Sequence, residues 1–186
     1  LLDRAGRGAP VGDWDLPTEV IKNYAAVVDR CYDRDLPVMG IVKTSSMGEV
    51  TESLREKIAQ NNLRGEQGTL HDIPWLRDHQ FVGEVLRDPS LNHLTYTSWF
   101  VQTEVELRGE SFDLLESVSD DLRHGDPSDY QRAFCYVRTP KTGNIFRVET
   151  PALFLTDDDR RKEILLKVLK EIARQGDVPT AVARAD

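Results

Sequence analysis

The sequence predicts one mixed α/β domain, spanning residues 1–186, in which strands and helices alternate along the chain. Segment 37–43 is an almost continuous apolar run, which is typical of a buried central strand. Segments 132–138 and 145–149 are two further apolar runs joined by a turn that contains proline and glycine, and they predict an antiparallel hairpin. Apolar residues at helical spacing in the segments around these runs predict the helices.

The first and last predicted helices have clear signals at their ends. Residues 17–34 carry apolar side chains at helical spacing and start at Pro17, where a proline is tolerated. Residues 160–174 follow three aspartates, 157–159, which are expected to cap the helix at its positive end, and Gly176 stops it. Weaker patterns predict a strand end at 1–3, a helix at 45–60, one broken or two short helices at 72–85, a strand within 96–107 and a short helix at 111–123.

Composition places the protein among globular chains that do not span a membrane. Hydrophobic residues make up 39% of the 186 residues, and no apolar run approaches the roughly 20 residues that cross a bilayer. Cys31 and Cys135 lie in apolar segments, so we expect buried thiols in a reducing cytoplasm rather than a disulfide. The chain has no signal peptide, but it starts at Leu1 rather than Met, so we expect an N-terminal region to be missing together with any targeting signal that it carries. The cytoplasmic location is expected from the cysteines.

The net charge of −8 argues against nucleic-acid binding, because basic residues that neutralise phosphates supply much of the affinity of such proteins. An uneven distribution of charge can still leave a basic groove on an acidic protein. The spacing of histidines and cysteines suits no structural zinc site. The sequence also has no dinucleotide-binding, phosphate-loop or serine-hydrolase motif.

Asp3 and Lys43 are candidate site residues because each lies at the end of a predicted strand. Two-metal nucleases place carboxylate ligands for Mg²⁺ or Mn²⁺ at such rigid positions, although a strand-end aspartate is also a common turn or cap residue. Lys43 would emerge at the carboxyl end of the predicted central strand, where sites of α/β proteins gather. It either contacts a phosphate or is a solvated surface lysine.

The predicted hairpin supplies the other candidates. Glu149 lies between Val148 and Pro151, and Arg147 and Arg138 belong to the same hairpin. One interpretation is a structural salt bridge. The other is a site in which Glu149 is a functional carboxylate and an arginine contacts the DNA backbone.

Several short segments, taken in order, form a pattern that covers nearly the whole chain. They are Leu1-Leu2-Asp3, Gly40-Ile41-Val42-Lys43-Thr44-Ser45-Ser46, Asp72 with the apolar helix after it, Ala133-Phe134-Cys135-Tyr136-Val137-Arg138, Phe146-Arg147-Val148-Glu149-Thr150-Pro151, and Val178-Pro179-Thr180-Ala181-Val182-Ala183-Arg184-Ala185-Asp186. In their order and spacing these segments resemble the NurA family, which comprises archaeal and bacterial nucleases of DNA double-strand break repair.

This resemblance implies an RNase H-like α/β fold, a mixed β-sheet flanked by helices, whose N-terminal part is missing here. It also implies a Mn²⁺-dependent 5′–3′ exonuclease with single-strand endonuclease activity, with Mg²⁺ as the alternative metal. The implied partners are DNA ends or single-stranded DNA, a second copy of the chain in a homodimer, and a hexameric HerA-type translocase. The candidate site residues are Asp3 and Asp186 as metal ligands and catalytic groups, Glu149 as a supporting catalytic carboxylate, and Lys43, Arg147 and Arg138 as DNA contacts.

Two departures from the family pattern bear on activity. The family's Asp-Gly-Ser motif and its glutamate lie upstream of this chain, and its tyrosine and histidine positions are Val178 and Asp186 here. Valine cannot orient water, and aspartate is a poorer acid than histidine near neutral pH. We therefore expect either a nuclease whose upstream part is missing or a catalytically degenerate subunit that dimerises and binds the translocase or DNA. An unrelated α/β domain is the third hypothesis.

Overall fold

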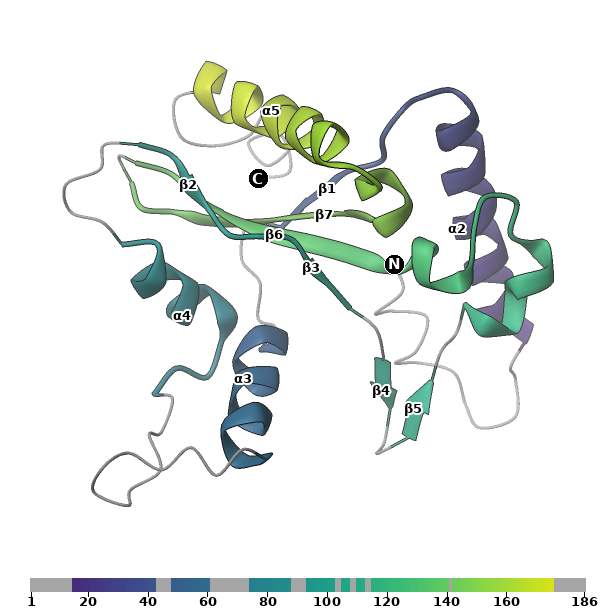
Figure 1. Cartoon of the computed structure of the whole chain (residues 1–186), viewed down its shortest axis with the longest axis horizontal. Coiled ribbons are helices and arrows are strands. Elements are labelled where there is room, and N and C mark those ends of the chain that lie inside the picture. Colours follow the sequence, from purple (N-terminus) through teal and green to yellow (C-terminus); the bar gives the residue numbers. More distant parts are fainter. Residues whose placement is uncertain are drawn as a thin grey trace. The chain divides into compact units, whose positions relative to one another are not determined.

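The computed structural model describes residues 15–42, 48–60, 74–87, 93–102, 105–107, 110–112, 115–140 and 142–175. Over these residues the protein is mixed α/β, with a mostly antiparallel sheet and flanking helices (Figure 1), which confirms the predicted fold class at this level. The strand end predicted at 1–3 and the segment 176–186 lie outside the described residues.

Most of the predicted helices are present within the described residues. The helix predicted at 160–174 is confirmed together with its cap, because the Asp157 Oδ1 accepts a hydrogen bond of 2.7 Å from the Arg160 N–H. The segment 111–123 contains a 3₁₀ helix instead of an α-helix, and Val118 has non-helical torsion angles within it. The α-helices are α2 (Asp15–Asp33), α3 (Glu49–Gln60), α4 (Asp78–Val85) and α5 (Asp158–Gln175), and the 3₁₀ helices are η1 (Glu116–Asp121), η2 (Pro127–Tyr130) and η3 (Ala152–Leu155).

The main sheet is organised around the predicted hairpin. Its order is β1-β7-β6-β2, and β3 also pairs with β6, while β4 and β5 form a separate two-stranded sheet. The strands are β1 (Gly40–Val42), β2 (Thr95–Tyr96), β3 (Phe100–Val101), β4 (Val105–Leu107), β5 (Glu110–Phe112), β6 (Arg132–Arg138) and β7 (Ile145–Pro151). The strand predicted at 37–43 is therefore present, but it is shorter than the apolar run.

The strand predicted within 96–107 is broken into three short strands, and the pairing register explains the first break. Tyr96 pairs with Val137, and Phe100 pairs with Phe134. Three residues, 97–99, thus lie opposite two residues of β6, 135 and 136, so one extra residue must be accommodated between β2 and β3, as in a β-bulge. The next strand, β4, pairs with β5 rather than with β6.

The turn between β6 and β7 depends on Gly143. The Thr139 N–H donates to the Asn144 carbonyl at 3.0 Å and closes the turn. Gly143 has φ of +68°, and a Cβ atom there would lie 3.1 Å from the Arg138 Nη2. Glycine therefore suits this position both by its backbone conformation and by the close approach of the arginine.

The described residues group into two compact units. One comprises those within 1–40, 99–134 and 149–170, and the other comprises those within 41–98, 135–148 and 171–186. The prediction of a single domain over the whole chain stays a prediction.

The hydrophobic core of the first unit brings together helix, strand and 3₁₀ residues. From α2, the side chains of Ile21, Ala25 and Val28 are buried at helical spacing, which confirms the helix predicted for residues 17–34. The sequence pattern favours a different apolar face, Val20, Tyr24, Val27, Val28 and Cys31, of which only Val28 is fully buried and Val27 is 52% exposed. The other core residues are Leu115, Val118, Tyr130, Ala133, Leu153, Phe154, Leu155 and Ile164.

The two cysteines form no disulfide. Cys135 is fully buried, and burial raises the pKa of its thiol to about 12, so the buried thiol predicted there is confirmed. Cys31 is only half-buried. Among the described residues, no helix has both the length and the apolar character needed to cross a bilayer.

Candidate functional site

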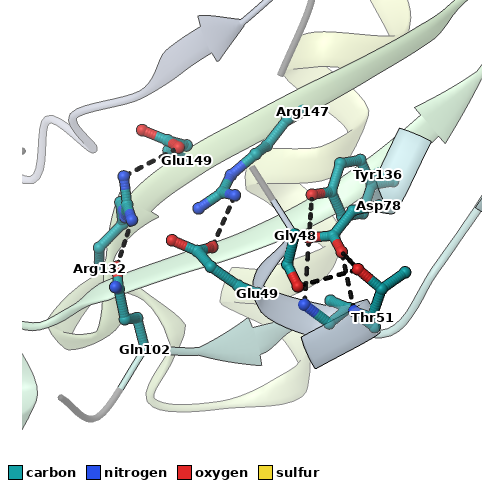
Figure 2. Close-up of polar contacts among 10 residues, drawn as sticks. Gly48, Glu49, Thr51, Asp78, Gln102, Arg132, Tyr136, Arg147 and Glu149 are labelled. Carbon is teal, nitrogen blue, oxygen red and sulfur yellow. Dashed lines mark hydrogen bonds and ion pairs between the residues drawn. The ribbon is translucent and has the colours of Figure 1, made fainter. Parts of the chain in front are cut away.

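An arginine–glutamate pair links the start of β6 to β7 in the first unit. The Arg132 Nη1 lies 3.4 Å from the Glu149 Oε1, and the Arg132 guanidinium also donates to the Gln102 side chain (Figure 2). The two side chains of the pair are 14% and 21% exposed, so the pair is largely buried but still reaches solvent. This arrangement places donor and acceptor groups side by side.

A cavity of about 510 Å³ lies beside this pair in the same unit. Its size falls within the range of small-molecule sites in proteins. The cavity is lined mainly by apolar side chains, with Asn23, Tyr24, Arg132 and Glu149 among its polar residues. The apolar lining includes Val20, Val27 and Val28 of α2, Pro151 of β7, and Val38 and Met39, which come just before β1.

Tyr24 at this cavity is a poor general base or nucleophile. Burial raises the pKa of its hydroxyl, and the nearby Glu149 raises it further, whereas Arg132 lowers it. The hydroxyl donates a hydrogen bond of 3.0 Å to the Tyr130 carbonyl. Tyr24 therefore stays protonated at neutral pH and serves the packing of α2.

A second ion pair lies in the other unit. Arg147 on β7 is completely buried, and its Nη1 lies 2.7 Å from the Oε2 of Glu49, in the first turn of α3 (Figure 2). The Arg147 Cζ also lies 6.0 Å from the centroid of the Tyr136 ring, within cation–π range. Glu49 and Tyr136 both stabilise the buried positive charge of Arg147.

Asp78 is a buried carboxylate that caps α3 from outside that helix. Its oxygens accept hydrogen bonds from the backbone N–H groups of Val50 at 3.1 Å and Thr51 at 2.9 Å. The Tyr136 hydroxyl donates to Asp78 at 2.9 Å, and the Thr51 hydroxyl lies 3.1 Å from it (Figure 2). Asp78 is itself in the first turn of α4, so one carboxylate connects two helix N-termini and β6.

The Tyr136 hydroxyl works as a donor in this network. Burial raises its pKa, and the neighbouring Asp78 carboxylate raises it further, because ionisation would put two negative charges together. Tyr136 therefore remains a neutral hydrogen-bond donor over the physiological range. The Tyr136 hydroxyl is therefore suited to positioning the Asp78 carboxylate rather than to transferring a proton.

A third network, in the first unit, is centred on the buried Tyr130. Its hydroxyl donates a hydrogen bond to the buried Asp29 carboxylate. The same hydroxyl accepts hydrogen bonds from the backbone N–H groups of Arg123 at 3.3 Å and His124 at 2.9 Å. Burial and the bond to Asp29 raise the pKa of Tyr130 to about 12, so this donor persists at neutral pH. The network attaches the 123–124 segment to α2.

Replacing Tyr130 with phenylalanine is expected to lower the free energy of unfolding by about 2–3 kcal/mol, because it leaves the buried Asp29 carboxylate and two partly buried backbone N–H groups without this hydroxyl. Urea unfolding followed by circular dichroism measures the change. Tyr32→Phe is the matched control, because Tyr32 is 38% exposed and its loss of a hydroxyl should cost about 0.5 kcal/mol or less. Equal losses in the two variants would contradict the role assigned to Tyr130.

Comparison with models of protein families decides the family of this chain. The model described as the NurA domain matches residues 1–186, which is the whole sequence. The chain belongs to the NurA family. No curated protein and no solved structure matches it. The resemblance drawn from the sequence is confirmed, and the NurA domain indicates a nuclease-related role in DNA repair.

Three predicted site residues of this NurA domain, Asp3, Lys43 and Asp186, lie outside the described residues, and so does Val178. Within the described ranges, no group of three or more His, Cys, Asp or Glu residues could hold a metal ion. The metal-binding and catalytic roles of Asp3 and Asp186 stay predictions.

Glu149, Arg147 and Arg138 lie within the described residues, and each of them contacts a different group. Glu149 pairs with Arg132, Arg147 pairs with Glu49, and Arg138 lies over the hairpin turn at Gly143. The structural salt bridge considered for Glu149 is thus present, but with a partner that the sequence did not suggest. The catalytic role of Glu149 and the DNA contacts of both arginines stay predictions.

Sequence reasoning missed Arg132, Glu49 and Asp78 in this NurA domain. Alternation along β6 could have placed Arg132 and Tyr136 on one face of the strand, since they are four residues apart. The acidic start of the helix predicted at 45–60 was also visible, but acidic residues at helix starts are too common to indicate a particular partner.

Proposed function

We propose that this NurA-family chain is a metal-dependent DNA nuclease that processes DNA ends, with Mn²⁺-dependent 5′–3′ exonuclease and single-strand endonuclease activity. The observation that supports the proposal is the match of the NurA domain to the entire chain. The proposal includes an RNase H-like sheet, a homodimer, and docking on a hexameric HerA-type translocase in the cytoplasm.

The donor set proposed for the metal consists of Asp3 and Asp186. Carboxylate oxygens are the ligands that Mn²⁺ and Mg²⁺ prefer, so the chemistry of these side chains fits either ion. When bound, such a cation supplies an activated water and stabilises the leaving oxygen of a phosphodiester. The two carboxylates would hold and orient the site, and the net charge of −8 on the protein favours cation binding.

The two described arginines proposed to contact DNA differ in burial. Arg138 is half-buried beside the hairpin turn, and together with Lys43 it would contact phosphates. Arg147 is buried with Glu49, so a phosphate contact there requires phosphate to replace the glutamate. In this scheme Glu149 supports the site through its pair with Arg132.

Titration of Mn²⁺ into the full-length protein, with 5′- and 3′-labelled single- and double-stranded DNA, tests the proposal. We expect metal-dependent digestion, and we expect Asp3→Ala to slow it by about 100-fold or more, because a lost ligand removes several kcal/mol of transition-state stabilisation. Asp159→Ala is the matched control, because this aspartate is 98% exposed on α5. Undiminished cleavage by Asp3→Ala would remove Asp3 from the mechanism.

A second candidate function is a catalytically degenerate subunit that dimerises and binds the translocase or DNA. The residues that favour it are Val178 and Asp186, which occupy the family's tyrosine and histidine positions. Metal-independent binding of DNA or translocase, without digestion at any Mn²⁺ concentration, is the result expected from this function.

A further inference from the structure

The cavity beside Arg132 and Glu149 has the composition of a site for a planar, uncharged ligand. Its walls are aliphatic, with Val20, Val27 and Val28 contributed by one helix. The two charged side chains at the cavity form an ion pair, so their charges largely cancel. A ligand that matches this lining presents an apolar ring face and a polar edge that carries no net charge.

The Arg132–Glu149 pair requires a particular hydrogen-bonding pattern on the polar edge of the ligand. The Arg132 guanidinium supplies N–H donors, and the Glu149 carboxylate supplies acceptor oxygens about 3.4 Å away. A carbonyl oxygen next to two N–H donors is the complementary pattern. Among the DNA bases, the Watson–Crick edge of guanine has this pattern, with O6 beside the N1–H and the N2 amino group.

A second cleft adjoins the cavity through a shared residue of α2. Asn23 lines both the apolar cavity and this cleft of about 400 Å³, which is lined also by Lys22, Arg30 and Arg123. Lys22 lies 3.2 Å from Asp121 and Arg123 lies 3.0 Å from Asp33, so these two cations are already paired with acidic residues. Arg30 is the remaining basic residue of the cleft, and a nucleotide in the apolar cavity would have a phosphate near it.

We propose that the cavity between α2 and β7 binds an unstacked guanine base of single-stranded DNA. Glu149 accepts hydrogen bonds from N1–H and N2–H, Arg132 donates to O6, and the valines of α2 cover one face of the ring. Arg30, in the adjoining cleft, attracts the neighbouring phosphate. The inference deepens the proposed nuclease function by giving the enzyme a sequence preference, and it rests on DNA being the substrate.

Binding is measured with fluorescein-labelled nonamers by fluorescence anisotropy, in EDTA so that no cleavage occurs. We expect a nonamer with one central guanine among thymines to bind about 10-fold more tightly than the all-thymine nonamer, the discrimination typical of a bidentate contact to a base. Inosine, which lacks the N2 amino group, should lose part of this preference.

Two variants assign the preference to this cavity. Glu149→Gln replaces one acceptor oxygen by a donor, and Val27→Trp fills the cavity from a position that is 52% exposed and so tolerates a larger side chain. Both should reduce the preference for guanine to about 2-fold or less. Glu19→Gln is the control, because Glu19 is exposed on α2 and lines neither cavity.

Equal binding of the guanine and all-thymine nonamers, or no binding of either, overturns the proposal. A preference that survives in both Glu149→Gln and Val27→Trp overturns its assignment to this cavity. Because the assay contains no metal, a guanine preference without Mn²⁺-dependent cleavage would contradict only the nuclease function. Cleavage without a guanine preference would contradict only the further inference.

Discussion

Replacing Glu49 with glutamine is expected to lower the free energy of unfolding by about 3–5 kcal/mol. The variant removes the negative charge that lies 2.7 Å from the Arg147 guanidinium, whose side chain is completely buried. Removing one partner of a buried ion pair is among the costliest single changes in a protein. Urea unfolding followed by circular dichroism measures the change, and the midpoint should fall without a change in slope.

Two further variants show whether charge or shape is responsible. Glu84→Gln removes a carboxylate that is 52% exposed and pairs with Arg87 at 3.6 Å, so it should cost about 0–1 kcal/mol. The double variant Glu49→Gln/Arg147→Met should recover a large part of the loss, because it removes the buried charge as well. A loss below about 1 kcal/mol in Glu49→Gln alone would show that the pair is not essential to stability.

Replacing Asp78 with alanine is the second large effect, with an expected loss of about 3–5 kcal/mol in the free energy of unfolding. The variant deprives the N–H groups of Val50 and Thr51, and the buried Tyr136 hydroxyl, of a charged acceptor. Hydrogen bonds to a charged group contribute about 1.5–3 kcal/mol each, although several bonds to one group are not additive. Amide exchange of Val50 and Thr51, followed by NMR, should accelerate because α3 loses its cap.

The control for Asp78 is an aspartate in the first turn of another helix. Asp159 is 98% exposed near the start of α5 and lies 3.6 Å from Lys162, so Asp159→Ala removes an acidic residue from a helix start without disturbing a buried network. It should cost less than about 1 kcal/mol. Similar losses in Asp78→Ala and Asp159→Ala would show that the buried network around Tyr136 adds nothing to an ordinary helix-dipole contribution.

Both predictions concern the hairpin, whose segments 133–138 and 146–151 are part of the pattern that resembles the NurA family. Tyr136 and Arg147 are buried residues within the segments that resemble NurA, and their partners Asp78 and Glu49 belong to helices outside the hairpin. The hairpin therefore depends on polar contacts as well as on apolar packing. We therefore expect the loss of either contact to destabilise the hairpin.

Local periodicity and turn chemistry were sufficient for several elements. The helix α2 follows from apolar residues at helical spacing within 17–34, and the cap at Asp157 follows from an aspartate placed before a helix. The hairpin follows from two apolar strands and Gly143. These features involve residues close together in the chain, so their energetics can be read from the sequence alone. The family could also be recognised from the order of short segments.

The tertiary structure decided which charged residues meet. Arg147 pairs with Glu49, 98 positions earlier in the chain, and Tyr136 bonds to Asp78 at a separation of 58 positions. Nothing in the spacing of a carboxylate indicates such a partner, because an ion pair depends on where packing leaves a buried charge. For the same reason the sequence could name Glu149 as a candidate but not Arg132, and it could not show the cavity beside them. The sequence determined the elements and the family, whereas burial of charge, which exists only in the folded chain, determined the polar contacts.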